Sequence, residues 1–250
     1  MTFALISFAC TFGAAVVATF IGALLPAAAL TKQSEDVVRL GIGLVAAMTA
    51  LLLGLVTAGA RSTFDSQDTA VRNSAAAILT LDRLLARYGP ETKPTRDLIR
   101  KTLEFRLQAL WGEMASGGAL LDAPESTPPI EDIENQILSL SPQTDSQRWF
   151  KDESLKLSQE VVRTRWRVLN SRDGSIPTPF LVVVIFWLTV TFFSFGLYAQ
   201  RNAIVIAVLF VSALSVAAAV FLILELDGPF DGVIRISSAP VRYALDHLGQ

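Results

Sequence analysis

Two uncharged apolar runs follow each other in this chain, Phe180–Gln200 and Asn202–Leu224, with Arg201 alone between them. A helix rises about 1.5 Å per residue, so the second run would be roughly 34 Å long and would cross the hydrocarbon core of a bilayer. A soluble helix of that length would need a polar face, and neither run has one. We therefore predict a transmembrane hairpin.

Charge is strongly segregated in the rest of the 250-residue chain. Residues 2–30 and 40–60 also carry no charge, whereas residues 61–174 hold 16 of the 21 basic and 17 of the 23 acidic residues. The polar segment has helical periodicity and no strand signal. The predicted fold class is therefore all-α, with four transmembrane helices and a helical insert between the second and third.

The expected organisation has four parts. Residues 1–60 hold spans 1 and 2, with a polar turn at residues 31–39, and residues 61–175 form the cytoplasmic helical insert. Residues 176–225 hold spans 3 and 4. Residues 226–250 hold an acidic turn and an amphipathic tail helix, which we expect on the membrane surface or against the insert. The first run lacks a basic n-region and is too long for a signal peptide, so we expect a retained span.

The composition excludes several function classes. The chain contains no phosphate-binding loop, nucleophile elbow or zinc-protease motif, so we expect no catalytic residue and no enzyme activity. Cys10 is the only cysteine and His247 the only histidine, which argues against an intramolecular disulfide and a zinc site. We expect no cofactor. The net charge of −2 does not favour nucleic-acid binding.

Span 2 carries small residues at steps of four, three, four and four, which places them on one helix face. They are Gly43, Ala47, Ala50, Gly54 and Ala58. Small residues let another backbone approach closely. The face therefore either packs against a helix of the same subunit or points toward a symmetry axis or pore.

Charged residues follow span 2 directly. Arg61 lies closest to the membrane, and Asp65 and Asp68 come next. In a symmetric oligomer a ring of the two acids would favour cations, whereas a dominant Arg61 ring would favour anions. The count of two acids against one arginine leans toward cations.

Span 4 ends in an acidic turn, which is the most distinctive local feature of the sequence. Its notable residues are Glu225, Asp227, Pro229, Phe230, Asp231 and Gly232. Carboxylates at a helix C-terminus oppose the helix dipole, so a nearby arginine would offset them. The turn is either a membrane-interface cap held by a salt bridge or an ion-attracting ring in an oligomer.

Basic residues near the span ends predict the orientation. Four spans place both termini and the insert on one side, which holds eight such residues against three on the other. By the positive-inside rule both termini and the insert are cytoplasmic. The eight are Arg61, Arg72, Arg163, Arg165, Arg167, Arg172, Arg235 and Arg242, and the three are Lys32, Arg39 and Arg201.

Distinctive motifs occur in the segments Ala60–Asp65, Arg87–Glu91, Ser175–Val184, Glu225–Gly232 and Ile234–Pro240. These motifs resemble the bestrophin-like family of bacterial membrane proteins. The resemblance covers nearly the whole chain and implies a multi-pass protein of the bacterial inner membrane. It also implies a more distant similarity in layout to bestrophins, which are pentameric ion channels with four spans, cytoplasmic termini and helical cytoplasmic regions.

Two functions fit these features. The first is a homo-oligomeric ion channel or channel-like pore of bestrophin-like layout in the lipid bilayer. The alternative is a non-conducting membrane scaffold or sensor whose cytoplasmic helices bind a protein partner. The oligomer symmetry would distinguish the channel from the scaffold or sensor, because a pore on an axis requires copies arranged symmetrically around it.

Overall fold

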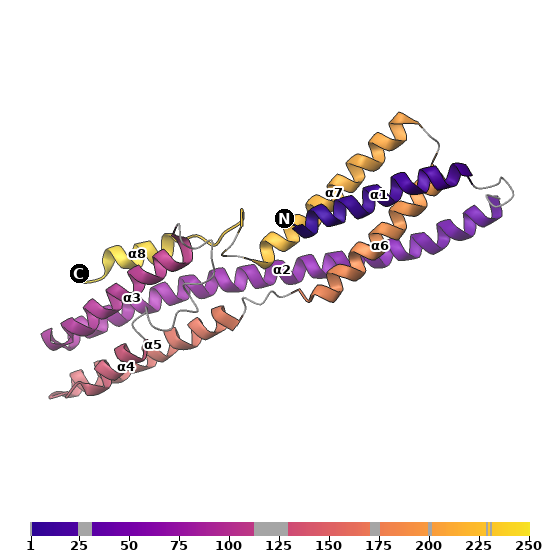
Figure 1. The fold of residues 1–250 in the computed structure, drawn as a ribbon. Helices are drawn as coiled ribbons and strands as arrows, with labels where there is room; N and C mark the ends of the chain where they lie inside the picture. Colours follow the sequence, from indigo (N-terminus) through magenta and orange to yellow (C-terminus); the bar gives the residue numbers. More distant parts are fainter. Residues whose placement is uncertain are drawn as a thin grey trace. The chain divides into compact units, whose positions relative to one another are not determined.

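The computed structural model describes residues 2–24, 32–112, 130–170, 176–199, 202–228, 230 and 232–250. In that part of the chain every regular element is a helix, and the prediction of an all-α fold is confirmed (Figure 1). The α-helices are α1 (Thr2–Leu24), α2 (Lys32–Tyr88), α3 (Lys93–Trp111), α4 (Ile130–Ser139), α5 (Asp145–Asn170), α6 (Thr178–Leu197), α7 (Ala203–Asp227) and α8 (Ala239–His247), and a 3₁₀ turn, η1, covers Pro90–Thr92.

The chain divides into two compact units. Unit 1 comprises Met1–Thr63 and Gly174–Asp227, and unit 2 comprises Phe64–Asp173 and Gly228–Gln250. The helix α2 contributes its first part to unit 1 and its second part to unit 2.

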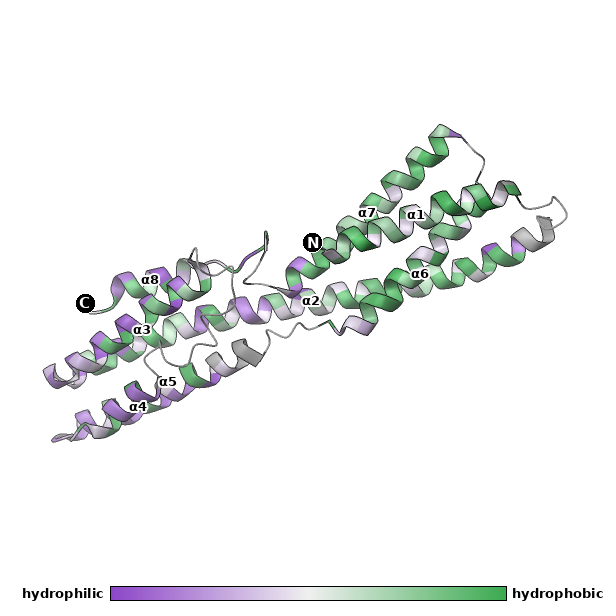
Figure 2. Ribbon diagram, viewed as in Figure 1, coloured by the Kyte–Doolittle hydropathy of each residue, from purple (hydrophilic) through white to green (hydrophobic). Residues whose placement is uncertain are grey.

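Four helices of the described chain are long and apolar enough to cross a membrane, as the sequence predicts. They are Thr2–Gly22, Asp36–Tyr88, Thr178–Leu197 and Ala203–Asp227. Figure 2 shows α1, α6 and α7 as apolar along almost their whole length, whereas α3, α5 and α8 mix apolar and polar residues. In unit 1, α1 packs against both α6 and α7.

The helix α2 differs from its prediction at its start. Residues 32–39 are helical, so the expected polar turn there is wrong. These residues include neither glycine nor proline, and a polar sequence without a helix breaker can simply extend a helix into water. The far end of α2 has a local cause: Gly89 adopts a φ of 152°, which favours glycine, and Pro90 follows with no amide donor.

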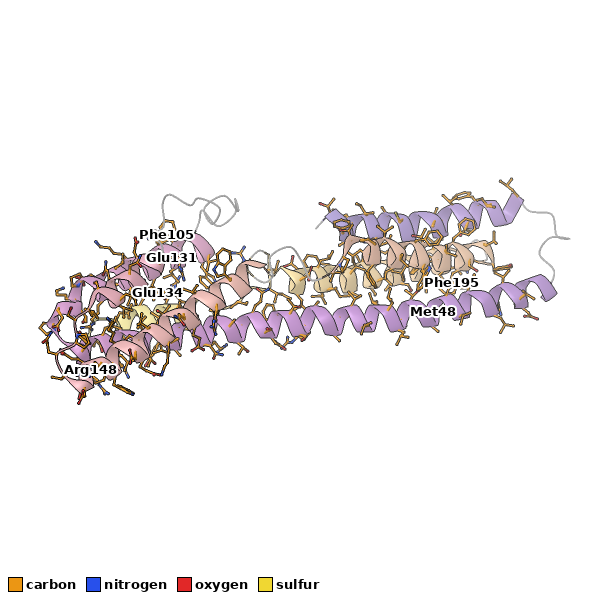
Figure 3. All side chains as sticks on the ribbon, turned by 90° about the horizontal axis from the view of Figure 1, so that it is seen from below. Met48, Phe105, Glu131, Glu134, Arg148 and Phe195 are labelled. Carbon is orange, nitrogen blue, oxygen red and sulfur yellow. The ribbon has the colours of Figure 1, made fainter. Side chains whose placement is uncertain are left out.

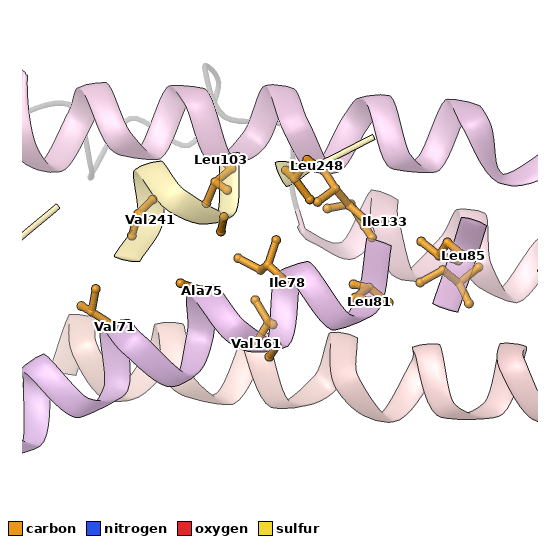
Figure 4. Packing of buried hydrophobic residues seen from close by; sticks show 14 of the residues in the cluster. Val71, Ala75, Ile78, Leu81, Leu85, Leu103, Ile133, Val161, Val241 and Leu248 are labelled. Carbon is orange, nitrogen blue, oxygen red and sulfur yellow. The ribbon is translucent and has the colours of Figure 1, made fainter. Parts of the chain in front are cut away.

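Unit 2 has its own apolar core, contributed by five helices and the C-terminal segment. In Figure 4 the stripe Val71, Ala75, Ile78, Leu81 and Leu85 of α2 faces side chains from α3, α4, α5 and α8. The facing residues include Leu103, Ile133, Val161, Val241 and Leu248. Leu85 and Ile137 are fully buried. The tail helix is therefore part of this core, which agrees with the alternative that placed it against the insert.

A buried carboxylate ties the tail to α2 and α3. Asp82 is 1 % exposed and accepts two hydrogen bonds from Arg96, at 2.7 Å from Nε and 2.9 Å from Nη2. The backbone N–H of Gly249 donates to the same carboxylate at 3.1 Å. The hydrogen bonds that Arg96 donates to Asp82 raise the pKa of the Arg96 guanidinium, so the guanidinium stays charged at physiological pH.

Further polar side chains hold the ends of the unit 2 helices. Lys151 donates to the carbonyls of Leu138 and Leu140, both at 2.8 Å, and so neutralises the C-terminal end of α4. Trp111 Nε1 donates to the carbonyl of Ile236 at 2.8 Å, and Arg100 Nη1 to that of Leu248 at 3.2 Å. The loops before and within the tail are thus fixed by specific donors.

The exposed face of helix α2 as candidate functional site

The small-residue face of span 2 is exposed in the single chain. Gly43, Ala47, Ala50, Gly54 and Ala58 are all exposed. A methyl group built on Gly43 or Gly54 would meet nothing within 4 Å. No helix of the same chain therefore packs on this face within the described residues, and the alternative of close packing inside one subunit is not what the structure shows.

The opposite side of α2 is the one that packs within unit 1. Thr49 is 4 % exposed and Ala60 is fully buried. Leu53 and Val56 line a small apolar cavity of about 10 Å³ with residues of α6 and α7, among them Val184 and Val220. Thr49 satisfies its hydroxyl by donating to the carbonyl of Val45 at 2.7 Å, as hydroxyl side chains in apolar helices commonly do.

Large apolar side chains form a second exposed stripe of α2. They are Leu40, Leu44, Met48, Leu51 and Leu55, each more than half exposed. Figure 3 labels Met48 on this helix. Each member directly follows or precedes a small residue in sequence, and adjacent helical positions differ by about 100° around the axis. The helix thus presents one stripe of bulky groups and, beside it, one stripe of small groups.

Close helix packing in unit 1 is provided instead by α1, which the sequence analysis did not single out. Ser7, Thr11, Ala15 and Ala18 are fully buried. A methyl group built on Gly196 of α6 would overlap with the backbone carbonyl of Ala15. The signal was present in the sequence, because these residues recur at steps of four, four and three, as in span 2. Spacing alone does not say which of two such faces is internal.

The charged residues after span 2 continue the small-residue face. Arg61, Asp65 and Asp68 follow Ala58 at steps of three, four and three, so they lie on the same side of α2. Arg61 and Asp65 are exposed, and each has an interaction within the chain. Asp68 pairs with Arg72 at 2.8 Å. This partner makes two acids and two arginines on this face, which removes the charge excess behind the expected cation preference.

The structure separates the members of the acidic turn. Glu225 and Asp227 are half-buried in the last turn of α7, in unit 1, and each has an interaction within the chain. Phe230 belongs to unit 2, where it is buried and packs edge-to-face on Trp111 with centroids 6.0 Å apart. Gly232, also in unit 2, has a φ of 118° that favours glycine. Pro229 and Asp231 lie outside the described residues.

No group of three or more His, Cys, Asp and Glu side chains in the described residues is placed to hold a metal ion. The arrangement of the site is therefore one of helix faces and fixed charges. Its chemistry is limited to packing against another helix, wetting by water, and attraction or repulsion of ions.

Comparison with known proteins agrees with this layout. The bestrophin-like domain matches residues 9–241. The chain belongs to the bestrophin-like family. None of the curated proteins matches it. This bestrophin-like chain is also similar in fold to solved structures.

Two of these structures are point mutants of a bacterial bestrophin homolog from Klebsiella pneumoniae. One is 16% identical with a TM-score of 0.64, and the other is 15% identical with a TM-score of 0.66. Each match covers 99% of both chains. A third crystal structure, described as a membrane protein, is 17% identical over 100% of both chains with a TM-score of 0.58. At such identities the similarity concerns the fold.

Proposed function

We propose that copies of this bestrophin-like protein assemble around an axis into an ion channel or channel-like pore of the bacterial inner membrane. The small-residue face of α2 lines the pathway in each copy, and its charges at residues 61–72 stand at the mouth. Both termini and unit 2 lie in the cytoplasm. The basic residues near the span ends support this orientation.

One observation carries the proposal: the small-residue face of α2 has no partner helix within the described chain. Only 6% of the apolar window of α2 is buried, against 28% for α1 and 39% for α6. Small residues gain little from contact with lipid and are enriched where helices or symmetry axes meet. The neighbouring stripe of large residues is the one suited to lipid.

The mouth charges determine how such a pore would treat ions. The pathway beside Gly43–Ala58 has no charge, so ions would pass only when it is hydrated, and dewetting could close it. Asp68 pairs with Arg72, and Arg61 and Asp65 carry opposite charges on the same face. We therefore expect weak selectivity between anions and cations rather than a strong preference.

The decisive experiment combines symmetry with conduction. Particle images of the detergent-purified protein should show a closed ring of copies, and the same preparation in planar bilayers should show unitary currents. Asp65→Asn should shift the reversal potential in a salt gradient toward anion preference. Intact rings that remain silent at both voltage polarities would contradict the channel and favour the scaffold or sensor.

Gly54→Leu tests whether the small-residue face meets another copy. The structure offers no atom of the same chain within 4 Å, so the fold of each chain should be retained. The ring should become smaller, weaker or non-conducting, because a branched side chain would enter a close contact. Gly41→Leu makes the same change where a methyl group also meets nothing within 4 Å but off the small-residue face, and it should leave assembly unchanged. Equal behaviour of the two variants would show that the face points into lipid.

A further inference from the structure

An outward face of α2 in unit 2 carries arginines that have no ion pair within the described residues. Exposed residues recur on this part of the helix at steps of four, three, four, three and four, which places them on one face. The face ends in Arg83 and Arg87, two like charges four residues apart that repel each other. Its members are Thr69, Asn73, Ala76, Thr80, Arg83 and Arg87.

An outward face of α5 has the same spacing. Trp149 leaves 57% of its surface uncovered, and its ring contacts that of the adjacent Phe150 with centroids 5.2 Å apart. Asp152 is exposed and has no ion pair within the part of the chain that the structure describes, whereas the adjacent Glu153 pairs with Lys156 at 3.0 Å. The members of this face are Asp145, Trp149, Asp152, Lys156, Gln159 and Arg163.

The two faces point away from one shared core. Ile78 and Leu85 of α2 and Val161 of α5 are buried in the core of unit 2 (Figure 4). Arg83 lies on the side of α2 away from these residues, and Asp152 lies on the side of α5 away from them. One copy therefore cannot bring the two charges together, whereas a second copy in a head-to-tail contact can.

The opposite charges lie at the same end of unit 2. Gln147, in the first turn of α5, donates to the carbonyl of Tyr88, the last residue of α2, at 3.1 Å. Arg83 precedes Tyr88 by five residues, and Asp152 follows Gln147 by five. At about 1.5 Å per residue, each charge lies roughly 7.5 Å along its helix from that contact. A rotation axis parallel to the helices keeps both charges at one height.

We propose that unit 2 of each copy binds unit 2 of the next copy through these two faces. The Arg83 guanidinium pairs with the Asp152 carboxylate of the next copy, and Arg87 stacks on the indole of Trp149 of that copy. Tryptophan and arginine are the residue types most enriched where interfaces gain their binding energy. The contact is head-to-tail and can close into a ring. It rests on the proposed assembly around an axis but not on ion conduction.

Cysteine cross-linking of the full chain in membranes tests this contact. Cys10→Ala removes the only native cysteine, and Arg83→Cys with Asp152→Cys then places one thiol on each face. Mild oxidation should give a ladder of disulfide-linked copies, up to the full ring, on a non-reducing denaturing gel. Either new cysteine alone should give no dimer, because a head-to-tail contact does not place a residue beside the same residue of the next copy.

Gln159→Cys in place of Asp152→Cys is the matched control. Gln159 is exposed on the same face of α5, but seven residues and therefore about 10 Å further along the helix. A disulfide needs Cβ atoms about 4 Å apart, so the ladder should be at least about tenfold weaker than with Asp152→Cys. Equal ladders from the two pairs would reflect random collisions and contradict the contact.

Charge reversal tests the ion pair itself. Arg83→Glu should weaken each contact between copies about fivefold, measured as the protein concentration in detergent at which the oligomer dissociates, because exposed ion pairs contribute at most about this factor. Addition of Asp152→Arg should restore the wild-type value. Addition of Glu160→Arg makes the same change of charge about two turns away and should not restore it. Equal rescue by the two changes would show that only net charge matters.

Three further results would overturn the proposal. Rings in particle images without a ladder from Arg83→Cys with Asp152→Cys would show that the copies meet through other surfaces, and would leave the proposed assembly intact. Absence of both rings and ladder would contradict the assembly and this contact together. A disulfide-linked dimer from Arg83→Cys alone would show a two-fold contact in place of a head-to-tail one.

Discussion

Gly54 and Gly196 are both helical glycines, but their surroundings differ. A methyl group on Gly54 would meet open space, whereas one on Gly196 would overlap with the main chain of α1 at Ala15. A backbone carbonyl within a helix cannot move aside as a flexible side chain can. Gly196 is therefore required for the contact between α1 and α6, and Gly54 is not required by any contact within the described chain.

Gly196→Ala should destabilise unit 1. Forcing a methyl group against the backbone of α1 costs about 1–3 kcal/mol, so the thermal unfolding midpoint in detergent should fall by several degrees. Gly13→Ala is the matched control, because Gly13 lies in the middle of α1 with nothing within 4 Å of the added methyl. It should be neutral or slightly stabilising, since alanine is the better helix former. Equal midpoints for the two variants would contradict the close approach.

Asp82→Asn should weaken unit 2. The change removes the charge that binds Arg96 and Gly249 while leaving the guanidinium only 20% exposed, and breaking such a pair costs about 3–5 kcal/mol. Asp97→Asn is the control, because its pair with Lys93 is exposed on both sides and contributes less than about 1 kcal/mol. The stability of both variants would be measured by thermal unfolding and by limited proteolysis. An Asp97→Asn protein as destabilised as the Asp82→Asn protein would contradict the special role of the buried pair.

At the level of elements, α8 shows that a short amphipathic helix can be a core element. Val241, Ala244 and Leu248 are buried, and the segment before α8 buries Phe230 and Ile236 in the same cluster. A nine-residue helix is too short to be stable alone in water. Its stability comes from packing against α3 and from the donors of Trp111 and Arg100.

Deletion of residues 239–250 should expose the core of unit 2. The chain should then be cleaved faster by protease within residues 64–173 and bind more of a dye that reports apolar surface. Removal of Gln250 alone should have no effect, because this residue is exposed. Unchanged protease resistance after the longer deletion would show that the tail covers the core without stabilising it.

For the whole molecule, topology is the first property to test. A reporter active only in the periplasm should be silent when fused at Gln250 and active when inserted at Asp36, because the distribution of basic residues predicts that the termini and unit 2 are cytoplasmic. The Asp36 position lies near the start of α2 and is exposed. Periplasmic activity of the Gln250 fusion would reverse the orientation.

The four spans and the all-helical polar segment could be predicted from the sequence because they depend on local properties. Length, absence of charge and helical period are all readable residue by residue, and α2 ends at Gly89-Pro90, a pair of residue types that commonly ends helices. The start of α2 could not be predicted in the same way, because a polar helix turn and a polar loop have similar composition. The residues 32–39 become helical through continuity with an apolar helix.

Which surfaces are internal was decided only by tertiary structure. Small-residue faces occur in α1 and in α2 with nearly the same spacing, but within the described residues that of α1 is covered by its own chain and that of α2 is exposed. Likewise, Phe230 of the acidic turn is buried in the core of unit 2. These outcomes depend on contacts between residues far apart in sequence. Periodicity determines the face of a helix on which a residue lies, whereas only the packed chain determines what that face meets.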